Sequence, residues 1–567
     1  AKRYASCPPV SQLLVQRGIT SVEEAEKFFS PRLKNLHDPF LMPDMDKAVN
    51  RLNRAMGAKE KIMVYGDYDV DGTTAVALVY KYLSNFYSNI DFFIPTRYEE
   101  GYGISSDIID DFADQGVKLV IILDCGIKAN EEIAHAREHG IDFIICDHHV
   151  PDAELPQAVA ILNPKIEGST YPCPHLSGCG VGYKLMQAFA MSNGIPQTDL
   201  EGMLDLVAVT IAADIVPMVD ENRIMAYYGL KRLNTNPNMG LRAIIRICNL
   251  TNREITISDV VFKIGPRINA AGRMRMDEND ENAAPSGGYA AVNLLIEGNE
   301  SLAEEFGSVI DGFNQDRKCI DRSVTQEAHD FIEAHAELKA AKSTVIYNPR
   351  WMKGIVGIVA SRLIETYYRP TVVLTMSNGF VTGSARSVPG FDLYQAIESC
   401  SDLLENFGGH MYAAGLTMRP ERVEEFTRRF NAYVEENIDP ITLQPQVEID
   451  SELFFSNITP AFRRDLNRFQ PFGPGNPAPV FVTRGVVSHG ETKLVGADCE
   501  HLRMDLMQRQ KPNTTIQTIA FQQPTHYEWI RAGHPIDVCY QIVENHYRGS
   551  VSVQLRIKDI KPLRSKQ

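Results

Sequence analysis

The chain has 567 residues, of which 44% are hydrophobic and 23% charged, a composition ordinary for globular proteins and long enough for three or four domains. No apolar run reaches the roughly 18–20 residues that cross a membrane, and the first residues lack the apolar core of a signal peptide. The net charge of −15 argues against a general polyanion binder. The ten cysteines are scattered without a C-x-x-C pair, so we expect reduced thiols and a cytoplasmic protein.

The first 50 residues are expected to form a helical lead-in. Ser21 precedes an amphipathic stretch and Glu24 follows three residues later, which is the pattern of a capping box. From about residue 60 to 215, short apolar runs alternate with helix-like segments. Near-continuous apolar runs are typical of strands buried on both faces, so we expect a mostly parallel α/β sheet. Its expected strands are at 61–65, 91–95, 117–124, 142–147 and 158–163.

The stretch VYGDYDVDGTT at 64–74 places three carboxylates at every second position of a Gly-bounded turn. Asp67, Asp69 and Asp71 repel one another unless a cation neutralises them. Oxygen ligands at this density suit a hard cation such as Mg²⁺ or Mn²⁺. An EF-hand also opens on D-x-D-x-D-G, but it needs a preceding helix and a Glu at its twelfth position. Here a strand precedes the turn and the twelfth residue is Leu78, so the EF-hand is rejected.

Further polar residues follow other expected strands. Asp124 closes one strand, and Asp147, His148 and His149 close another. Asp214 lies in a long apolar run, where an unpaired carboxylate is costly. Taken singly, each is explained better as a turn residue, a helix cap or a surface histidine than as a metal ligand. Because functional sites of such sheets lie at the carboxyl ends of the strands, their combination predicts one site.

Two later stretches combine glycine with other small or basic residues. GCGVGYK at 178–184 resembles a phosphate loop but lacks a preceding strand and a G-K-[ST] ending, so we interpret it as a tight entry to a helix at 183–192. In IGPRINAAGRMRM at 264–276, Arg267 and Arg273 alternate with small residues. This pattern suits a phosphate contact and a plain loop equally well.

The second half of the chain repeats the α/β pattern and then changes to short strands. A polar loop is expected at 277–288, and long helices from 289 to about 338 are expected to link two lobes. Gly-rich turns at 379–388 and 406–418 follow in a second α/β unit. After a Pro/Gly hinge at 471–481, short turn-separated strands indicate a small β-barrel or sandwich. Its slight positive charge suits an OB-like strand-binding module, and its aromatic residues suit an ordinary core equally well.

Six motifs, in this order, resemble those of the DHH phosphoesterase superfamily and, within it, of the bacterial RecJ single-strand-specific 5′→3′ exonucleases. DYDVDGTT resembles the first family motif, LDCG the second, CDHH the third and AADIVP the fourth. GGHMYAAG resembles the signature of the DHHA1 domain, and PFGPGNPAPVF resembles the lead into the OB-fold. The resemblance runs nearly from end to end.

The resemblance implies an α/β fold of two lobes, DHH and DHHA1, with mostly parallel sheets joined by a long helix and followed by a C-terminal β-barrel of the OB-fold. A narrow cleft between the lobes would exclude duplex. The expected parts are an N-terminal helical lead-in at 1–50, a DHH catalytic domain at 51–300, connecting helices at 301–340, a DHHA1 domain at 341–440 and an OB-fold nucleic-acid-binding domain at 448–567.

The resemblance also implies a phosphodiesterase that holds two Mn²⁺ or Mg²⁺ ions in one active site. The family's metal ligands correspond to Asp69, Asp71, Asp124, His148 and Asp214, with Asp124 bridging the ions. The implied role of Asp67 is either that of a further ligand or that of a support for the ligands.

Other family positions are implied to contact the substrate. His149 would contact the scissile phosphate, and Asp147 would orient the histidines. With Asp124, these two form the implied catalytic set. The 5′-phosphate and strand contacts correspond to Arg97, Ser384, Arg386, His410, Arg267 and Arg273.

Two positions depart from the family pattern. Tyr65 stands where some relatives carry a histidine, so a ligand sometimes found there is missing. Met352 stands where a histidine is common in the Trp-x-x-Gly segment, which ends here at Gly354. Neither departure removes a carboxylate of the implied metal core.

The implied activity is 5′→3′ digestion of single-stranded DNA to 5′-mononucleotides, in DNA repair and recombination. Single-stranded DNA would be the substrate, with a single-strand-binding protein and a helicase as candidate partners. One alternative is a DHH phosphodiesterase acting on nano-RNA or small nucleotides, which would need neither the lead-in nor the β domain. The other is an inactive strand-binding scaffold, a class that loses motif carboxylates, whereas here all of them are present.

Overall fold

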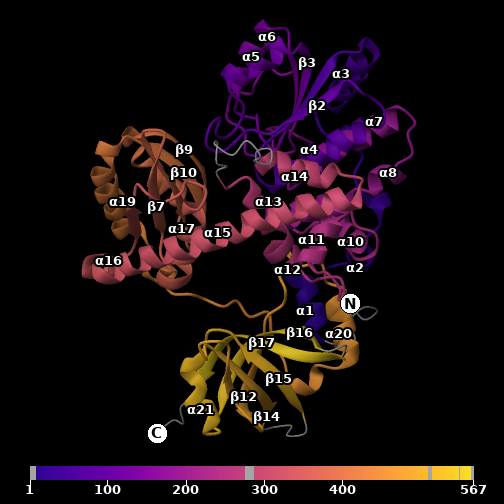
Figure 1. Ribbon diagram of the computed structural model, residues 1–567. Helices are drawn as coiled ribbons and strands as arrows, with labels where there is room; N and C mark the ends of the chain where they lie inside the picture. Colours follow the sequence, from indigo (N-terminus) through magenta and orange to yellow (C-terminus); the bar gives the residue numbers. More distant parts are fainter. Residues whose placement is uncertain (1–7, 275–286, 509–513, 548–549, 564–567) are drawn as a thin grey trace.

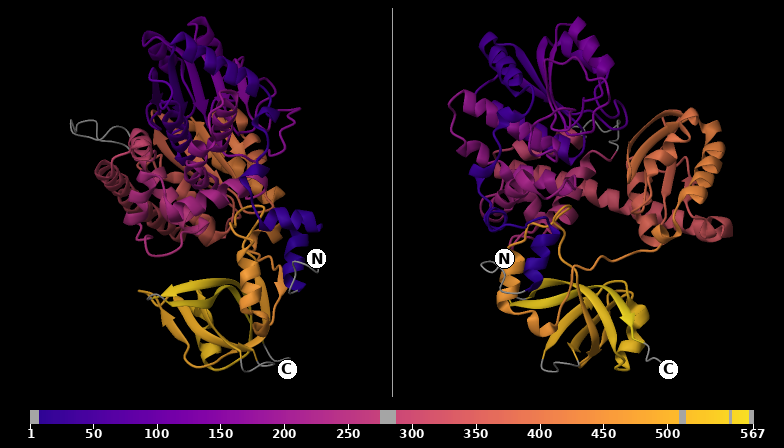
Figure 2. Two further views of the ribbon diagram at one scale, coloured as in Figure 1. Left: turned by 90° about the vertical axis from the view of Figure 1, so that its right-hand side faces the viewer. Right: turned by 180° about the vertical axis from the view of Figure 1, so that it is seen from behind.

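The computed structural model describes residues 8–274, 287–508, 514–547 and 550–563. Two α/β lobes are joined by the long helix α15 (Glu300–Ala334), and a β-barrel lies below them (Figure 1). The view from behind shows the same three bodies, with the N-terminal helices between the first lobe and the barrel (Figure 2). Within the described residues, no helix combines the length and the apolar character needed to cross a membrane.

The first lobe is built on a five-stranded parallel sheet in the order β2-β1-β3-β4-β5. The predicted parallel α/β sheet is therefore confirmed. The strand order reverses between β1 and β3, and ligands of such sheets bind at the carboxyl ends of the strands around this point. The strands are β1 (Lys61–Gly66), β2 (Ile90–Phe93), β3 (Val117–Leu123), β4 (Asp142–Cys146) and β5 (Ala160–Leu162).

Helices cover both faces of this sheet because its strands are apolar on both sides. In β1, Ile62 and Val64 face one helical layer, whereas Met63 and Tyr65 face the other. The first layer contains α3 (Met45–Ala58), α4 (Val70–Leu83), α7 (Gly178–Ser192) and α9 (Leu204–Ala213), and the second contains α5 (Ser106–Asp114) and α6 (Asn130–Glu138).

The rest of the first lobe is helical, and the stretch around Arg267 forms a helix in place of a plain loop. Of the loop expected at 277–288, residues 277–286 lie outside the described residues. Gly287 and Gly288 open a helix, and a Cβ there would lie 1.9 Å from Ala271 O and 2.3 Å from Ile94 Cγ2. The helices are α8 (Thr198–Glu201), α10 (Asp220–Thr235), α11 (Met239–Ile247), α12 (Ile257–Asp259), a π-helical turn (Val260–Ile264), α13 (Gly265–Ala271) and α14 (Gly287–Ile296).

The second lobe carries a mixed sheet in the order β6-β7-β8-β10-β9, reached through α15 and α16 (Ala336–Ala340). Only β6 and β7 run parallel, so the expectation of a mostly parallel sheet is wrong for this lobe. The sheet is formed by β6 (Thr344–Tyr347), β7 (Thr371–Ser377), β8 (Phe380–Arg386), β9 (Leu404–His410) and β10 (Ala413–Met418), and its helices are α17 (Val356–Tyr367), α18 (Leu393–Glu398) and α19 (Val423–Asn437).

The two Gly-rich stretches of this lobe are strands, which corrects the turns expected from their composition. Their glycines serve close packing between strands. A Cβ on Gly383 would lie 2.3 Å from Leu374 Cδ2, and one on Gly409 would lie 2.3 Å from Ala413 O. Glycine in a strand marks such close approach as well as a turn, and the sequence pattern does not separate the two.

The C-terminal domain is a closed barrel, as expected for an OB-like module. Strand β12 pairs with both β16 and β14, which closes the ring β12-β16-β17-β15-β14. The elements are β11 (Ser451–Glu452), α20 (Pro460–Asn467), β12 (Phe481–Ser488), β13 (Lys493–Val495), β14 (His501–Gln508), β15 (Thr515–Ala520), α21 (Tyr527–Arg531), β16 (Ile536–Tyr547) and β17 (Ser550–Pro562).

The N-terminal helices α1 (Pro8–Gln16) and α2 (Val22–Phe29) pack in the core of the barrel domain, which comes from the other end of the chain. The predicted capping box of Ser21 and Glu24 is confirmed. The lead-in expected at 1–50 therefore divides: its first two helices join the barrel domain, whereas α3, which continues past residue 50, packs on the first sheet.

The Pro/Gly stretch before the barrel is docked on the first lobe and is not a free hinge. Met218 N donates to Pro474 O (2.6 Å). The buried Arg223 donates to the carbonyls of Arg468 (3.1 Å) and Gln470 (2.9 Å). Since Met218 lies four residues after Asp214, the barrel domain abuts the segment that carries a candidate metal ligand.

Substitution Arg223→Ala should weaken this docking by about 3 kcal/mol, because it leaves buried carbonyls without a donor. Limited proteolysis within residues 438–480 should then become roughly 100-fold faster, since cleavage tracks the open population. Arg428→Ala, at a side chain that is 69% exposed, is the matched control and should leave the rate unchanged. Equal rates for Arg223→Ala and the wild type would contradict the docking.

Candidate active site

The carboxylates predicted from the sequence gather at the carboxyl ends of β1 and β3. Asp67, Asp69 and Asp71 follow β1, and Asp124 follows β3. Asp69 caps α4 by accepting from Asp71 N (2.8 Å) and Gly72 N (3.1 Å). Asp67 and Asp71 are buried, and burial together with the neighbouring Asp69 raises the pKa of Asp67 to about 8 and that of Asp71 to about 7.

The N-terminus of α7 holds Asp71 in place. Asp71 accepts from Gly178 N (2.6 Å) and Cys179 N (2.9 Å). The stretch GCGVG is thus the first turn of α7, capped by Ser177, and not an entry to a helix at 183–192. A Cβ on Gly178 would lie 2.5 Å from Asp124 Oδ1, so this glycine leaves room for the second carboxylate.

His148, at the end of β4, lies among three carboxylates. Its Nε2 is 3.2 Å from Asp124 Oδ1, 3.6 Å from Asp214 Oδ2 and 4.0 Å from Asp71 Oδ2. Burial lowers the pKa of His148 to about 3, with the neighbouring His149 adding to the effect, so the imidazole is neutral. A neutral imidazole is the form that binds metal ions.

These side chains fit a metal centre because several of their buried polar atoms have no partner. Asp67 Oδ1, Asp124 Oδ1 and both ring nitrogens of His148 make no hydrogen bond. Burial also raises the pKa of Asp124 well above its usual range and that of Asp214 to about 8. Buried polar groups normally find partners, and divalent cations supply one for carboxylate and imidazole alike.

Asp147 and His149 form a second unit beside this centre. Asp147 Oδ1 accepts from His148 N (2.7 Å), His149 N (3.1 Å) and His149 Nδ1 (2.7 Å), and Oδ2 accepts from Ile127 N (3.0 Å). Burial opposes ionisation of both side chains, but their mutual hydrogen bond lowers the pKa of Asp147 to about 2 and raises that of His149 to about 9. His149 is therefore a fixed cation at neutral pH.

A basic cluster of Arg97, Arg273, Arg386 and Ser384 lies where the lobes meet. Arg97 packs 4.0 Å from the ring centroid of Tyr68. Arg386 Nη1 donates to Ser384 Oγ (2.8 Å). Burial lowers the pKa of Arg273, and repulsion from Arg97 and Arg386 lowers it further, so three guanidinium groups from two lobes share one region. An anion is the ligand that such a cluster favours.

Contacts between the lobes hold this cluster together. Tyr98 Oη donates to Arg273 O (2.8 Å), and Gly354 N donates to Tyr98 Oη (3.3 Å). A Cβ on Gly354 would lie 2.2 Å from Arg273 O, so the final glycine of the Trp-x-x-Gly segment permits this approach. Arg273 itself donates to Gly354 O (3.2 Å).

The remaining predicted residues are placed differently. Arg267 is held by Asp311 (2.8 Å) and Lys263 O (2.8 Å), so the structure uses it to join α13 to α15. His410 is exposed at the end of β9, and its pKa is lowered by burial and then by Arg386 and His149, which places it within electrostatic range of both sites.

The structure adds residues that sequence reasoning missed. Tyr102, which is 60% exposed, has its ring 6.2 Å from that of His149. Burial and the neighbouring Asp71 and Asp69 raise the pKa of Asp214, and the charge of Lys165 offsets part of this rise. Asn269 accepts from Val70 N (3.0 Å) and so supports the first turn of α4. Only Tyr102 carried a signal, the G-Y-G triplet after Arg97; the other two depend on long-range packing.

Comparison with known proteins agrees with these features. Residues 61–211 match the DHH family N-terminal domain, residues 340–436 the DHHA1 domain and residues 449–559 the RecJ OB domain. The single-stranded-DNA-specific exonuclease RecJ of Escherichia coli K12 is 32% identical over 99% of this chain and 97% of its own length. The protein of the same name from Bacillus subtilis 168 is 35% identical over 97% of this chain and 68% of its own.

The chain belongs to the RecJ family. The crystal structure of RecJ in complex with Mn²⁺ from Thermus thermophilus superposes with a TM-score of 0.81 at 25% identity, over 98% of this chain and 76% of that one. A structure of exonuclease RecJ bound to manganese gives a TM-score of 0.60 at 28% identity, over 72% of this chain and 98% of that one. The fold and the three-part organisation are thus those of RecJ proteins.

In this RecJ-family chain, Gly178→Ala should weaken Mn²⁺ binding at least about tenfold, because the new Cβ displaces Asp124. Isothermal titration calorimetry measures the change. Gly180→Ala is the matched control, since its Cβ would come no closer than 3.4 Å to a neighbour. Alanine has a higher helix propensity than glycine, so an effect on helix α7 alone would stabilise both variants. Unchanged affinity for Gly178→Ala would contradict the assigned crowding at Asp124.

Mn²⁺ binding to the metal-free protein should release protons below pH 7. The raised pKa values of Asp67, Asp71 and Asp214, about 7 to 8, mean that these carboxyls hold protons there and must lose them to bind a cation. Calorimetry in buffers of different ionisation enthalpy should show at least one proton released at pH 6.5 and almost none at pH 9. The apparent affinity for Mn²⁺ should rise from pH 6.5 to pH 9. An affinity that does not change with pH would contradict the role of these carboxyls as metal ligands.

Proposed function

We propose that this chain is a single-stranded-DNA-specific exonuclease that digests from the 5′ end and releases 5′-mononucleotides by metal-dependent phosphodiester hydrolysis. The observation that carries the proposal is the convergence of Asp71, Asp124 and Asp214 on His148 Nε2, at 3.2 to 4.0 Å, beside a basic cluster. The named relatives are RecJ exonucleases, which supports the same assignment.

The centre would hold two Mn²⁺ or Mg²⁺ ions through Asp67, Asp69, Asp71, Asp124, His148 and Asp214. RecJ of Thermus thermophilus is described in complex with Mn²⁺. Bound divalent ions supply a nucleophile at neutral pH and offset negative charge on a phosphodiester. Buried atoms of Asp67, Asp124 and His148 that make no hydrogen bond would bind these ions. The position of the ions would in turn fix the position of the phosphodiester.

His149 would then bind a non-bridging oxygen of the scissile phosphate. Its raised pKa keeps it protonated, and the bond to Asp147 fixes the ring so that Nε2 points away from Asp147. A protonated imidazole that is already oriented before the substrate binds stabilises the negative charge that develops on the phosphate without further reorganisation. Asp147, with its four accepted hydrogen bonds, stays ionised and acts through His149 and His148.

The basic cluster would bind the terminal 5′-phosphate and so set the direction of digestion. Arg97 and Arg273 come from the first lobe, and Ser384 and Arg386 come from the second. Because both lobes contribute, only an end that enters between them reaches all four side chains. The charges of Arg386 and His149 both act on His410, which would therefore lie near the bound end.

The barrel domain is proposed to hold the strand outside the catalytic lobes by phosphate and stacking contacts. Arg267 would serve as a strand contact only after its ion pair with Asp311 opens. A single-strand-binding protein and a helicase are the proposed partners, since an enzyme that needs single strands depends on a reaction that separates duplex. The cysteines within the described residues are free thiols, which suits the reducing cytoplasm proposed as its location.

Two other functions are less well supported. A phosphodiesterase acting on nano-RNA or small nucleotides does not explain why α1, α2 and the barrel are docked on the lobes by buried contacts such as that of Arg223. An inactive strand-binding scaffold does not explain why so many carboxylates are buried with raised pKa values.

Digestion of a 3′-labelled, 5′-phosphorylated single strand tests the function most economically. With Mn²⁺, products should shorten progressively from the 5′ end, and duplex of the same sequence should resist. Asp124→Asn should lower the rate at least about 1,000-fold, and asparagine keeps the fold because it tolerates the positive φ of 61° at this position. Shortening from the 3′ end, or equal digestion of dinucleotides and long strands, would contradict the proposal.

Arg386→Ala should slow digestion of 5′-phosphorylated strands about 10–100-fold, because a charged hydrogen bond to phosphate is lost. Unphosphorylated strands should be affected much less. Arg422→Ala, at an exposed position of the same lobe, is the matched control for loss of one positive charge. An equal loss on both kinds of end would show that Arg386 does not recognise the terminal phosphate.

A further inference from the structure

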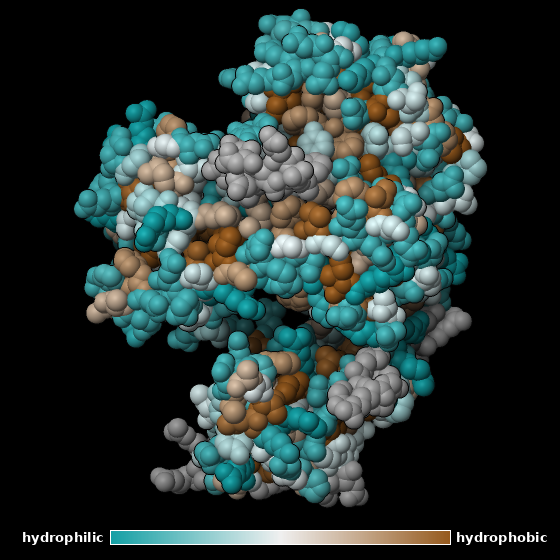
Figure 3. Space-filling view, viewed as in Figure 1, coloured by the Kyte–Doolittle hydropathy of each residue, from teal (hydrophilic) through white to brown (hydrophobic). Residues whose placement is uncertain are grey.

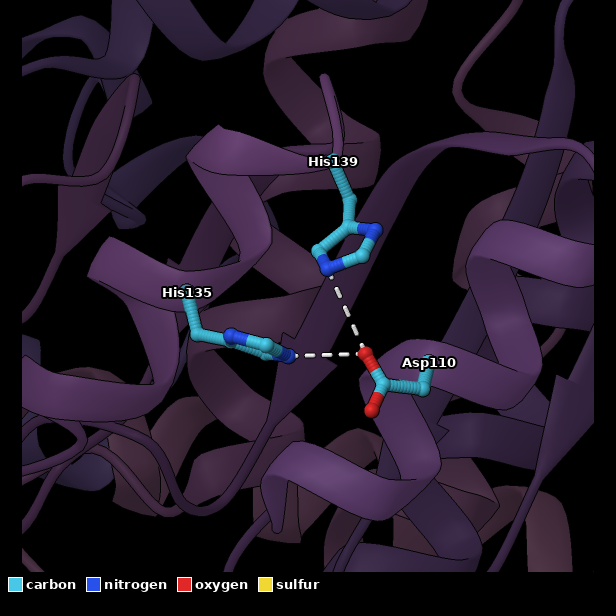
Figure 4. Close-up of side chains that lie close together, drawn as sticks. All are labelled: Asp110, His135 and His139. Atoms are coloured by element: carbon cyan, nitrogen blue, oxygen red, sulfur yellow. Dashed lines mark hydrogen bonds and ion pairs between the residues drawn. The ribbon is translucent and has the colours of Figure 1, made fainter.

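Two histidines and one aspartate converge on the outer surface of the first lobe, away from the catalytic edge. Asp110 lies on α5, His135 lies on α6 and His139 caps the end of α6. All three side chains point toward one another (Figure 4). Their ligand atoms lie within 4.8 Å of one another. We refer to Asp110, His135 and His139 as the α5–α6 cluster.

The α5–α6 cluster is separate from the proposed catalytic centre. α5 is followed by the start of β3 at Val117, and α6 by the start of β4 at Asp142, so the cluster lies toward the amino ends of these strands. The catalytic carboxylates lie at the carboxyl ends. The seven residues of β3 put roughly 20 Å between these two edges of the sheet.

The distances suit a bound cation. His135 Nε2 lies 2.7 Å and His139 Nε2 lies 3.3 Å from the same oxygen, Asp110 Oδ1. Ligand atoms on a tetrahedral ion at about 2.1 Å are about 3.4 Å apart. The second distance already matches this spacing, and the first matches it after a shift of roughly 0.7 Å, within the reach of a side chain that is 53% exposed.

An ordinary ion pair explains this arrangement less well. An ordinary surface ion pair joins one carboxylate to one imidazole. Here two imidazoles, four residues apart on one helix face, approach the same carboxylate oxygen (Figure 4). The rings are tilted by 60° with their centroids 4.7 Å apart, so they do not stack flat on each other. Both Nε2 atoms therefore lie close to the same oxygen, Asp110 Oδ1.

The charge around the α5–α6 cluster also favours a cation. α5 carries Asp107, Asp110, Asp111 and Asp114 and no basic residue. α6 carries Glu131, Glu132 and Glu138 against the single basic charge of Arg137. Hydrophilic residues cover this end of the first lobe in the space-filling view, so an ion there is reached from water (Figure 3).

We propose that Asp110, His135 and His139 form a second metal site that takes a late first-row divalent cation of the Zn²⁺, Co²⁺ and Ni²⁺ class, with water completing the coordination. Two imidazoles and one carboxylate are the ligand set that such ions prefer, whereas Mg²⁺ and Mn²⁺ favour oxygen. The bound ion cross-links α5 to α6 and so stabilises the outer helical layer of the lobe. The site neither depends on nor contributes to the proposed nuclease chemistry.

The experiment counts ions bound to the full chain. Untagged protein stripped by a chelator is dialysed against micromolar Ni²⁺ in excess Mg²⁺, and bound nickel is measured by mass spectrometry for the wild type and for His135→Gln/His139→Gln. The double variant should bind one ion fewer per chain. His489→Gln, at an exposed histidine of the barrel domain, is the matched control and should bind as many ions as the wild type.

A second readout separates loss of the site from damage to the fold. Nickel should raise the unfolding temperature of the wild type and of His489→Gln but not that of the double variant, because only a native-state site stabilises by mass action. Mn²⁺-dependent digestion of single strands should be equal in all three proteins. Equal nickel counts in the wild type and the double variant, or equal thermal shifts, would overturn the proposal.

Discussion

The structure depends on the electrostatic cost of burying several like charges at one point of a sheet. Asp67, Asp71 and Asp124 lie at the carboxyl ends of β1 and β3, where the two helical layers exclude water. The backbone amides of α7 stabilise Asp71, but they leave one oxygen of Asp67 and one of Asp124 without a partner. Divalent cations offset this cost, and without them the carboxyls keep their protons because the pKa values are raised.

The proposed recognition of a strand end depends on how the second lobe meets this centre. Tyr98, Gly354 and Arg273 fix the approach of the lobes, and their contacts bring arginines of both lobes together. The barrel domain joins the same assembly from the other side, where Pro474 contacts Met218, close to Asp214. The metal centre, the basic cluster and the barrel are thus connected through short segments next to the candidate ligands.

Much of the fold and of the candidate site could be predicted from the sequence because both depend on local patterns. Buried parallel strands are apolar throughout, and the polar residues that end them, Asp124 and His148 among them, mark the functional edge. Composition predicts turns at 379–388 and 406–418 because glycine is common in turns, whereas Gly383 and Gly409 allow close packing between strands. The roles of Gly178 and Arg223, and the packing of α1 and α2 on the barrel, depend on contacts between distant segments that no local pattern encodes.

The carboxylates around Asp124 are proposed to form a binuclear metal centre. The most direct measurement is the anomalous difference density of a crystal of the protein grown with Mn²⁺, collected at the manganese absorption edge. We expect two anomalous peaks in contact with Asp124, flanked by Asp67, Asp71, His148 and Asp214. A single peak, or density at a site that excludes Asp124, would contradict it.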